Sequence, residues 1–113
     1  MRIRKRQCVA CPWKTSTVPE RDIANGYSAD AHRALKTTIA APGSLEAGPL
    51  MACHESPVGR EQVCAGWIAH QLGPGNNLVL RMRAMDGRFD DIELDGPQHE
   101  CFEDTLPKGD GNG

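Results

Sequence analysis

Two cysteines near the start of the chain carry the clearest chemical signal. Cys8 and Cys11 form a C-x2-C pair, a spacing that lets the backbone turn tightly so that two thiolates converge on one tetrahedral ion. The other two ligands of such an ion can come from anywhere later in the chain. Cys53 ends a short apolar segment, and Cys64 shares a predicted helix face with core residues. We therefore predict one metal site with the ligands Cys8, Cys11, Cys53 and Cys64.

Other residues near these cysteines leave the ligand set partly open. His54 follows Cys53 directly and is an alternate ligand, since sites with three cysteines and one histidine also bind zinc. Adjacent side chains diverge in an extended segment, so we favour Cys53 as the ligand and His54 as an outer donor. Cys101 lies in an acidic stretch and is expected to be a free thiol without a chemical role. The remaining histidines are not predicted as ligands, and His70 is expected to be exposed: His32, His70 and His99.

The same cysteines could serve other chemistries, which we weigh against a structural zinc ion. An iron–sulfur cluster is the main alternative, because a Cys-Pro step recurs in cluster-binding sequences. A thioredoxin-like redox pair needs a preceding strand, and seven residues precede Cys8. A Cys53-His54-Glu55 triad is disfavoured because consecutive side chains do not face one another. A zinc hydrolase is disfavoured because four thiolates leave no open position for water. We favour zinc and a protein that is not an enzyme.

Three short blocks resemble a family of small uncharacterised proteins found in bacteriophages, prophages and actinobacteria. The family pattern is C-x2-C-P-W, then C-H-x-S, then C-A-G-W. The matching blocks are Cys8-Val-Ala-Cys-Pro-Trp13, Leu50-Met-Ala-Cys-His-Glu-Ser56 and Cys64-Ala-Gly-Trp67. The resemblance implies that the four cysteines are the family's metal ligands, with His54 a candidate participant. It implies a phage origin and brings no known activity.

The resemblance also points to residues that support the ligands. Trp13 and Trp67 stand beside ligands and would shield the metal from water. Gly66 would let another backbone approach the helix that contains Cys64. Ser56 would hydrogen-bond at the site or cap the turn that leads to this helix.

Size and composition explain why a metal is expected at all. The chain has 113 residues, of which 4% are aromatic, with 12 glycines and 8 prolines, so hydrophobic burial alone offsets little of the entropy of ordering. Its basic start runs into Cys8 with no apolar stretch of signal-peptide length. We therefore expect a cytoplasmic protein with reduced thiols, in a bacterial host cell if the resemblance holds. No run approaches the roughly 18 apolar residues of a membrane span.

The elements that must position the cysteines give a small single domain. We predict an α+β fold, mostly helical and irregular, over residues 1–106, organised around one metal site with four cysteine ligands, with a disordered tail at 107–113. Helices capped by Ser28 and by Asn76 or Asn77 are expected, with Leu78, Met82 and Met85 facing inward from the last one. The predicted helices are 28–40, 60–72 and 77–85, with a short helical turn at 98–105 and strands at 48–53 and 90–95.

Charge is distributed unevenly along the chain. Residues 1–40 hold eight Lys and Arg against three acids, whereas residues 89–113 hold one against eight. The basic cluster could contact nucleic acid, together with Arg81 and Arg88, but a pI near 6.0 favours an arm that is solvated or paired with the acidic segment. Its members are Arg2, Arg4, Lys5 and Arg6.

The function that these observations predict is binding. We expect a zinc-stabilised accessory protein of phage type that binds a macromolecular partner, which is a host protein or nucleic acid. The acidic segment 90–104 would suit a basic protein surface, or would imitate nucleic acid toward a host protein. The alternative is an iron–sulfur or thiol redox protein. The sequence indicates no membrane partner and no small-molecule substrate.

Overall fold

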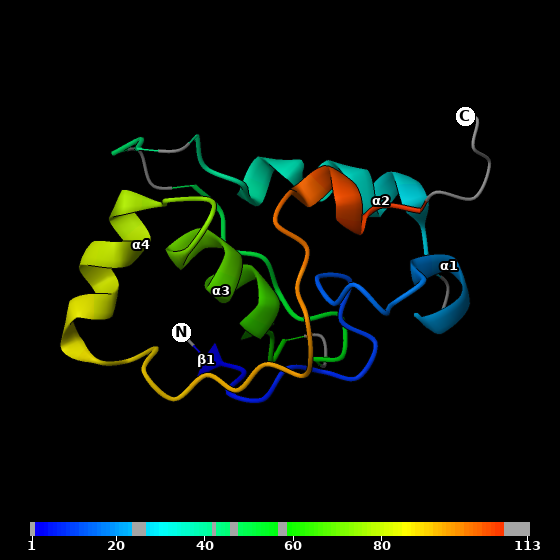
Figure 1. Ribbon diagram of the computed structural model, residues 1–113, viewed down its shortest axis with the longest axis horizontal. Coiled ribbons are helices and arrows are strands. Elements are labelled where there is room, and N and C mark those ends of the chain that lie inside the picture. The colour runs from blue at the N-terminus through cyan, green and yellow to red at the C-terminus, as the bar shows by residue number, and fades with distance from the viewer. Residues whose placement is uncertain (1, 24–26, 42, 46–47, 57–58, 108–113) are drawn as a thin grey trace.

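Short helices surround a small cysteine-bearing core in the computed structural model, which describes residues 2–23, 27–41, 43–45, 48–56 and 59–107. α3 lies near the centre, with α2 and α4 on different sides of it (Figure 1). The predicted small single domain, mostly helical and irregular, is confirmed at this level, and it contains one short strand pair. The elements, in chain order, are β1 (Arg2–Ile3), α1 (Pro19–Asp22), α2 (Ala29–Ala34), η1 (Leu35–Thr38), β2 (Gln62–Val63), α3 (Ala65–Leu72), α4 (Leu78–Arg83), η2 (Ala84–Asp86) and η3 (Phe102–Thr105).

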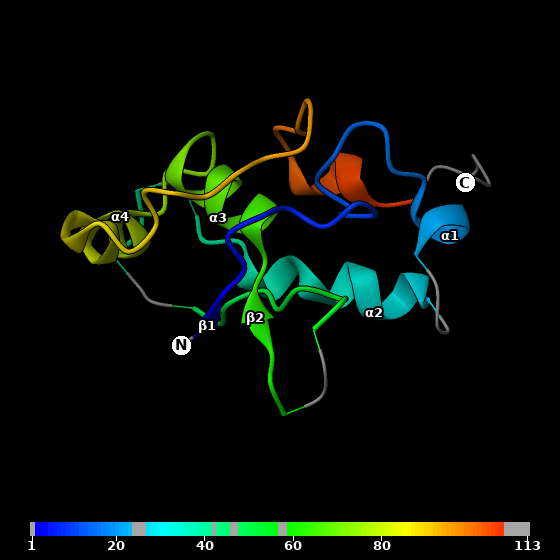
Figure 2. The same ribbon diagram turned by 90° about the horizontal axis from the view of Figure 1, so that it is seen from below.

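The N-terminus forms a parallel strand pair that the sequence did not indicate. β1 pairs with β2 in the register Arg2 to Gln62 and Ile3 to Val63 (Figure 2). On its other side Val63 bridges Ala52 in antiparallel fashion. The predicted strand at 48–53 is therefore reduced to this single bridge. Val63 is buried where the three segments meet, which brings the N-terminus next to two of the cysteines.

The helix predicted at 28–40 is present in two parts. Ser28 caps α2 as expected, and its hydroxyl oxygen accepts a hydrogen bond of 3.1 Å from the backbone N–H of Ala31. The chain then tightens into η1, where the Thr38 hydroxyl donates to the carbonyl of Leu35. This turn ends the segment at Ile39, whose backbone is extended.

The start of the helix predicted at 60–72 is wrong. Residues 62 and 63 are extended because they pair with β1 and with the chain near Ala52. α3 begins at Ala65, so Cys64 is the N-cap and does not lie inside the helix. Pairing on both sides outweighs the helical periodicity of this short stretch.

The helix predicted at 77–85 is found, but its buried face is different. Asn77 is the N-cap, and its side-chain oxygen accepts from the N–H of Leu80. Leu80 is buried, whereas Met82 and Met85 are 57% and 85% exposed. The expected inward face was wrong because α4 contacts α3 along one short stripe. η2 then ends at Gly87 in the left-handed conformation.

The acidic C-terminal segment runs back along the N-terminus rather than forming a strand. In the predicted strand 90–95, Glu93 bridges Arg6, and Leu94 is 44% exposed. The final turn η3 lies within the helical turn predicted at 98–105. The disordered tail predicted at 107–113 lies, from Lys108 onward, outside the described residues.

Candidate metal centre

The first two cysteines lie in a tight turn that the buried side chain of Lys14 stabilises. The N–H of Cys11 donates to the carbonyl of Cys8 at 3.3 Å, and the N–H of Lys14 donates to the carbonyl of Cys11 at 3.1 Å. The Lys14 ammonium donates to the carbonyl of Val9, at 2.9 Å, and to Asp95, at 2.7 Å. The turn is therefore tied to the C-terminal segment by a buried charge.

The second two cysteines lie on the antiparallel bridge. The N–H of Cys53 donates to the carbonyl of Gln62 at 2.7 Å, and the N–H of Cys64 donates to the carbonyl of Met51 at 2.9 Å. Both the N–H and the hydroxyl of Ser56 donate to the carbonyl of Cys53 and close the turn that follows it. This pairing brings both cysteines into the core.

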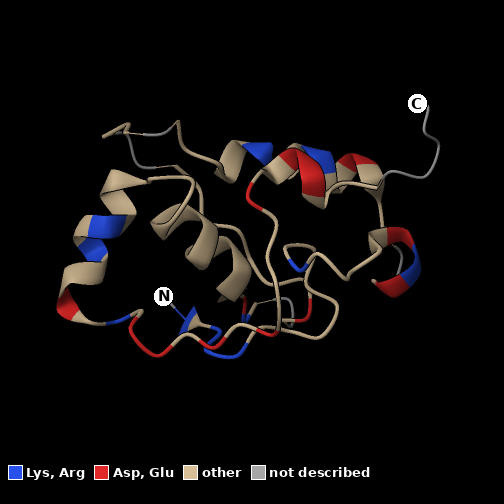
Figure 3. Ribbon diagram, in the orientation of Figure 1, with Lys and Arg blue, Asp and Glu red and all other residues tan. Residues whose placement is uncertain are grey.

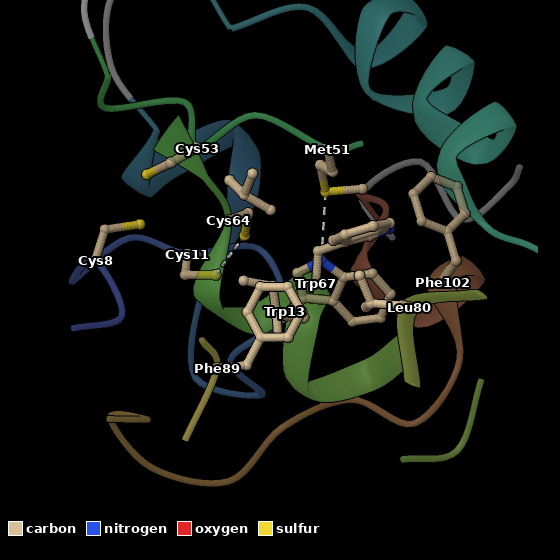
Figure 4. Close-up of a cluster of buried hydrophobic side chains, with 12 residues drawn as sticks. Cys8, Cys11, Trp13, Met51, Cys53, Cys64, Trp67, Leu80, Phe89 and Phe102 are labelled. Carbon is tan, nitrogen blue, oxygen red and sulfur yellow. Dashed lines mark hydrogen bonds between the residues drawn. The ribbon is translucent and has the colours of Figure 1, made fainter. Parts of the chain in front are cut away.

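All four predicted ligands are buried (Figure 4), but in the described part of the chain no three of their sulfurs lie within 4.8 Å of one another. The sulfurs of Cys11 and Cys64, which come from the two halves of the site, are 3.8 Å apart. A disulfide would hold them at about 2.05 Å, and all five cysteines are free thiols. Cys101 is exposed, as the sequence predicts for a free thiol away from the site.

Hydrogen bonds between the thiols shift their pKa values. The hydrogen bond from Cys64 lowers the pKa of Cys11 to about 3, and the N–H of Trp13 acts in the same direction. The hydrogen bond from Cys8 lowers the pKa of Cys53 to about 6, helped by the N–H of Glu55. The pKa values of the two hydrogen-bond partners, Cys8 and Cys64, are raised instead. Hydrogen bonding to Cys11 and Cys53 raises the pKa of Cys8, and hydrogen bonding to Cys11 followed by burial raises that of Cys64. These hydrogen bonds favour the thiolate at Cys11 and Cys53 and the protonated thiol at Cys8 and Cys64.

A second group of candidate ligands shares Cys8. The ligand atoms of Cys8, His54 and Glu55 lie within 4.8 Å of one another, so this cluster could hold a metal ion. His54 Nε2 is 3.4 Å from the Cys8 sulfur and 3.2 Å from the carbonyl oxygen of Ala10. A carbonyl accepts and never donates, so the contact with Ala10 requires a proton on Nε2. In this arrangement His54 is an N–H donor beside Cys8.

Close packing holds the two halves of the site together. A Cβ atom added to Gly66 would lie 2.7 Å from the Trp13 Cβ and 2.9 Å from the Cys11 sulfur. The indole N–H of Trp13 donates to the Met51 sulfur at 3.4 Å, and that of Trp67 donates to the carbonyl of Thr38 at 3.0 Å. Both tryptophans are buried beside the cysteines. Only glycine allows α3 to approach the first turn this closely.

Sequence reasoning missed a buried glutamine at the site. The side chain of Gln7 hydrogen-bonds to the Cys11 sulfur and contributes to lowering its pKa. Its amide also pairs reciprocally with that of Gln98, at 2.7 and 2.8 Å, and accepts from the N–H of Asp95. Its position directly before Cys8 was the available signal, but nothing local shows that the chain returns 91 residues later to pair with it.

The prediction that His70 is exposed was wrong. His70 is buried, stacks on Trp13 with ring centroids 4.5 Å apart, and contacts the carbonyl of Glu100 at 2.9 Å. Burial also lowers the pKa of His70. His32 is buried as well, against Phe102, and His99 is half-buried. These imidazoles belong to the packing of the core rather than to its surface.

The basic N-terminal cluster pairs with acidic residues (Figure 3). Arg4 lies 3.5 Å from Glu55, Lys5 lies 2.6 Å from Asp91, and Arg6 lies 3.4 Å from Glu93. This matches the alternative of an arm paired largely with the acidic segment, while Arg2 lies in β1. Separately, the described part of the chain contains no helix that is both long and apolar enough to cross a membrane.

The comparisons with known proteins give a family without an assigned activity. No curated protein and no solved structure matches the chain. One family model, described as a family of unknown function (DUF6283), matches residues 3–108, which is nearly the whole chain and includes every predicted ligand. The expected membership in a family of uncharacterised proteins is confirmed to this extent. The chain belongs to the DUF6283 family.

Proposed function

We propose that the four buried thiols bind one zinc ion that holds the fold together, and that the protein acts by binding a macromolecular partner. The observation that carries the metal is the separation of the Cys11 and Cys64 sulfurs, 3.8 Å. In a tetrahedral site with zinc–sulfur bonds of about 2.3 Å, neighbouring sulfurs are about 3.8 Å apart. The two halves of the chain therefore already lie at the spacing of two ligands of one ion.

The thiol set is a better ligand set than the group formed by Cys8, His54 and Glu55. His54 and Glu55 are exposed, and each has another partner: Ala10 for the imidazole and Arg4 for the carboxylate. The four cysteines are buried, and backbone N–H groups of Trp13, Glu55 and Trp67 interact with three of their sulfurs. Such donors support thiolates that bind a metal. His54 would then act as an N–H donor to the Cys8 thiolate.

Four thiolates around zinc leave no open coordination position, so we place the function on the surface. The basic arm has most of its charges paired, which makes a protein partner a better proposal than nucleic acid. α4 and η2 present the exposed side chains of Met82 and Met85 next to Arg83, and methionine is frequent at adaptable binding surfaces. An accessory role in a phage, with a host protein as partner, is part of this proposal.

Metal analysis tests the site directly. We expect colourless protein purified without oxygen to contain about one zinc ion per chain, and complete chelation to abolish its native circular dichroism because metal binding is folding free energy here. Cys11→Ser should lose the metal and the fold, whereas Cys101→Ser, at the exposed free thiol, should keep both. A brown protein containing iron and sulfide would favour the cluster alternative. Native circular dichroism after complete metal removal would contradict the structural role.

A further inference from the structure

A surface pocket of about 300 Å³ lies against the candidate metal centre. Pro12 and His54, which follow cysteines in the two turns, form one part of its wall. The rest comes from the segment between α1 and η1, with the apolar side chains of Ile23, Ala31 and Leu35 and the polar residues Tyr27, Ser28 and His32. This volume is at the lower end of the range for small-ligand sites. The pocket wall thus combines residues of the two cysteine-bearing turns with residues of the segment from α1 to η1.

Two polar residues that line this pocket, His32 and Tyr27, have hydrogen bonds that assign their protons. The Thr105 hydroxyl donates to the carbonyl of Phe102 at 2.6 Å, so its oxygen accepts from His32 Nε2–H at 3.1 Å. His32 Nδ1 therefore carries no proton and accepts from the Tyr27 hydroxyl at 2.7 Å. Burial raises the pKa of Tyr27 and lowers that of His32, which keeps both groups neutral.

This chain of hydrogen bonds determines what Tyr27 can offer a ligand. Its proton is used on His32, so the phenol oxygen has lone pairs left and acts as an acceptor. A donor that is itself hydrogen-bonded is also a better acceptor, because such chains polarise one another. The described residues that line the pocket include no Lys, Arg, Asp or Glu. A charged ligand would lose its hydration there without gaining an ion pair.

We propose that this pocket binds a neutral, flat, apolar group that carries one N–H donor, such as an indole, with the donor directed at the Tyr27 oxygen. Such a group belongs to a free heteroaromatic compound or to a tryptophan side chain of a partner protein. The inference assigns a ligand class to a site beside the metal, and it rests on the pocket geometry rather than on the identity of the metal.

The single tyrosine of the chain provides a selective probe. Full-length protein labelled with 3-fluorotyrosine should give one fluorine resonance, and titration with indole should shift it to saturation. 1-Methylindole has the same ring but no N–H, and should bind about tenfold more weakly because one hydrogen bond is lost. Indole-3-acetate should not shift the resonance, since its carboxylate has no partner in the pocket. N-acetyltryptophanamide should bind if the group comes from a protein, and only free indole should bind if it comes from a small molecule.

Filling the pocket supplies the matched variants. Ala31→Phe places a ring in the pocket and should weaken indole binding at least tenfold, whereas Ala34→Phe, on the same helix but outside the pocket, should leave it unchanged. Ala31→Leu replaces the larger variant if circular dichroism shows that Ala31→Phe is unfolded. Equal binding of indole and 1-methylindole, or unchanged indole binding by the filled variant, would overturn the proposal. Metal content is measured on the same samples, so loss of zinc with retained indole binding would refute the metal site alone.

Discussion

The two ends of α3 bury polar groups in opposite ways. At the N-terminal end, the sulfurs of Cys64 and Cys11 lie 3.8 Å apart, and the hydrogen bond from Cys64 lowers the pKa of Cys11. At the C-terminal end, His70 Nε2–H donates to the carbonyl of Glu100, and its Nδ1 accepts from the amide of Gln71 at 2.9 Å. The oxygen of Gln71 accepts in turn from Asn77 at 3.0 Å.

The difference shows which end requires a ligand. In the chain from Asn77 through Gln71 and His70 to Glu100, each donor meets an acceptor and no charge remains, so that end is complete within the protein. At the sulfur end, the lowered pKa values of Cys11 and Cys53 favour buried thiolates, whose charge is costly unless a cation compensates it. The zinc ion proposed above would supply that cation, although histidine is also a common metal ligand.

The largest effect on stability is expected when a methyl group is added at Gly66, where α3 packs closely against the turn that contains Cys11. In Gly66→Ala the new methyl group would lie 2.7 Å from the Trp13 Cβ and 2.9 Å from the Cys11 sulfur. The Trp13 Cβ is fixed to the backbone and cannot move aside alone, so α3 must move away from the first turn. We expect the free energy of unfolding to fall by about 3 kcal/mol and the zinc content to fall with it. Chemical denaturation and metal analysis measure the two.

Gly48→Ala is the matched control, because its added methyl group would make one ordinary contact, 3.7 Å from the carbonyl of Thr37. We expect this exposed position to change stability little. Equal losses in the two variants would contradict the role that we assign to the close approach of α3 to the first turn.

The comparison of the two ends also explains how much of the fold the sequence could predict. Local signals were reliable: Ser28 and Asn77 cap the helices that the pattern predicted. Pairing between separate segments of the chain could not be recognised in the sequence. Residues 62 and 63 have helical periodicity, but they are held extended by β1 and by Ala52, which lie far away in the sequence. A two-residue strand leaves no periodic signal of its own.

The candidate site shows the same difference between local signals, which the sequence reveals, and long-range contacts, which it does not. Spacing and residue type selected four cysteines that the structure buries, and the imidazole of His54, expected to be an outer donor, contacts the carbonyl of Ala10. Gln7 and Lys14 could not be selected in this way. Their partners, Gln98 and Asp95, lie more than 80 residues later and meet them only in the folded chain.

A smaller effect is expected when the charge beside the sulfur end is removed. The Lys14 side chain is 9% exposed and bonds to both Asp95 and the carbonyl of Val9. Lys14→Met keeps its apolar length but leaves these acceptors unpaired. We expect it to lower the free energy of unfolding by about 2 kcal/mol. Lys5→Met is the control, since its ion pair with Asp91 is half exposed and is expected to contribute less than about 1 kcal/mol. Equal losses in urea denaturation would contradict the distinction.

The smallest effect concerns the imidazole end and depends on pH. Burial lowers the pKa of His70 below its ordinary value of 6.5, so the unfolded chain binds the proton more readily than the folded one. The contribution of His70 to stability is therefore present above about pH 6.5 and is lost as the pH falls through that value. Protonation would also place a donor on Nδ1 opposite the Gln71 amide, which is a donor itself.

We expect urea denaturation of zinc-saturated protein to show a loss of stability between about pH 7.5 and about pH 5.5, smaller than the loss caused by Lys14→Met. His70→Gln keeps a donor for the Glu100 carbonyl and does not titrate in this range, so part of the pH dependence should disappear in this variant. An identical pH dependence in the two proteins would assign the whole effect to other groups, with the thiols first among them. The neutral network at the C-terminal end of α3 would then have no measurable part in the response to acid.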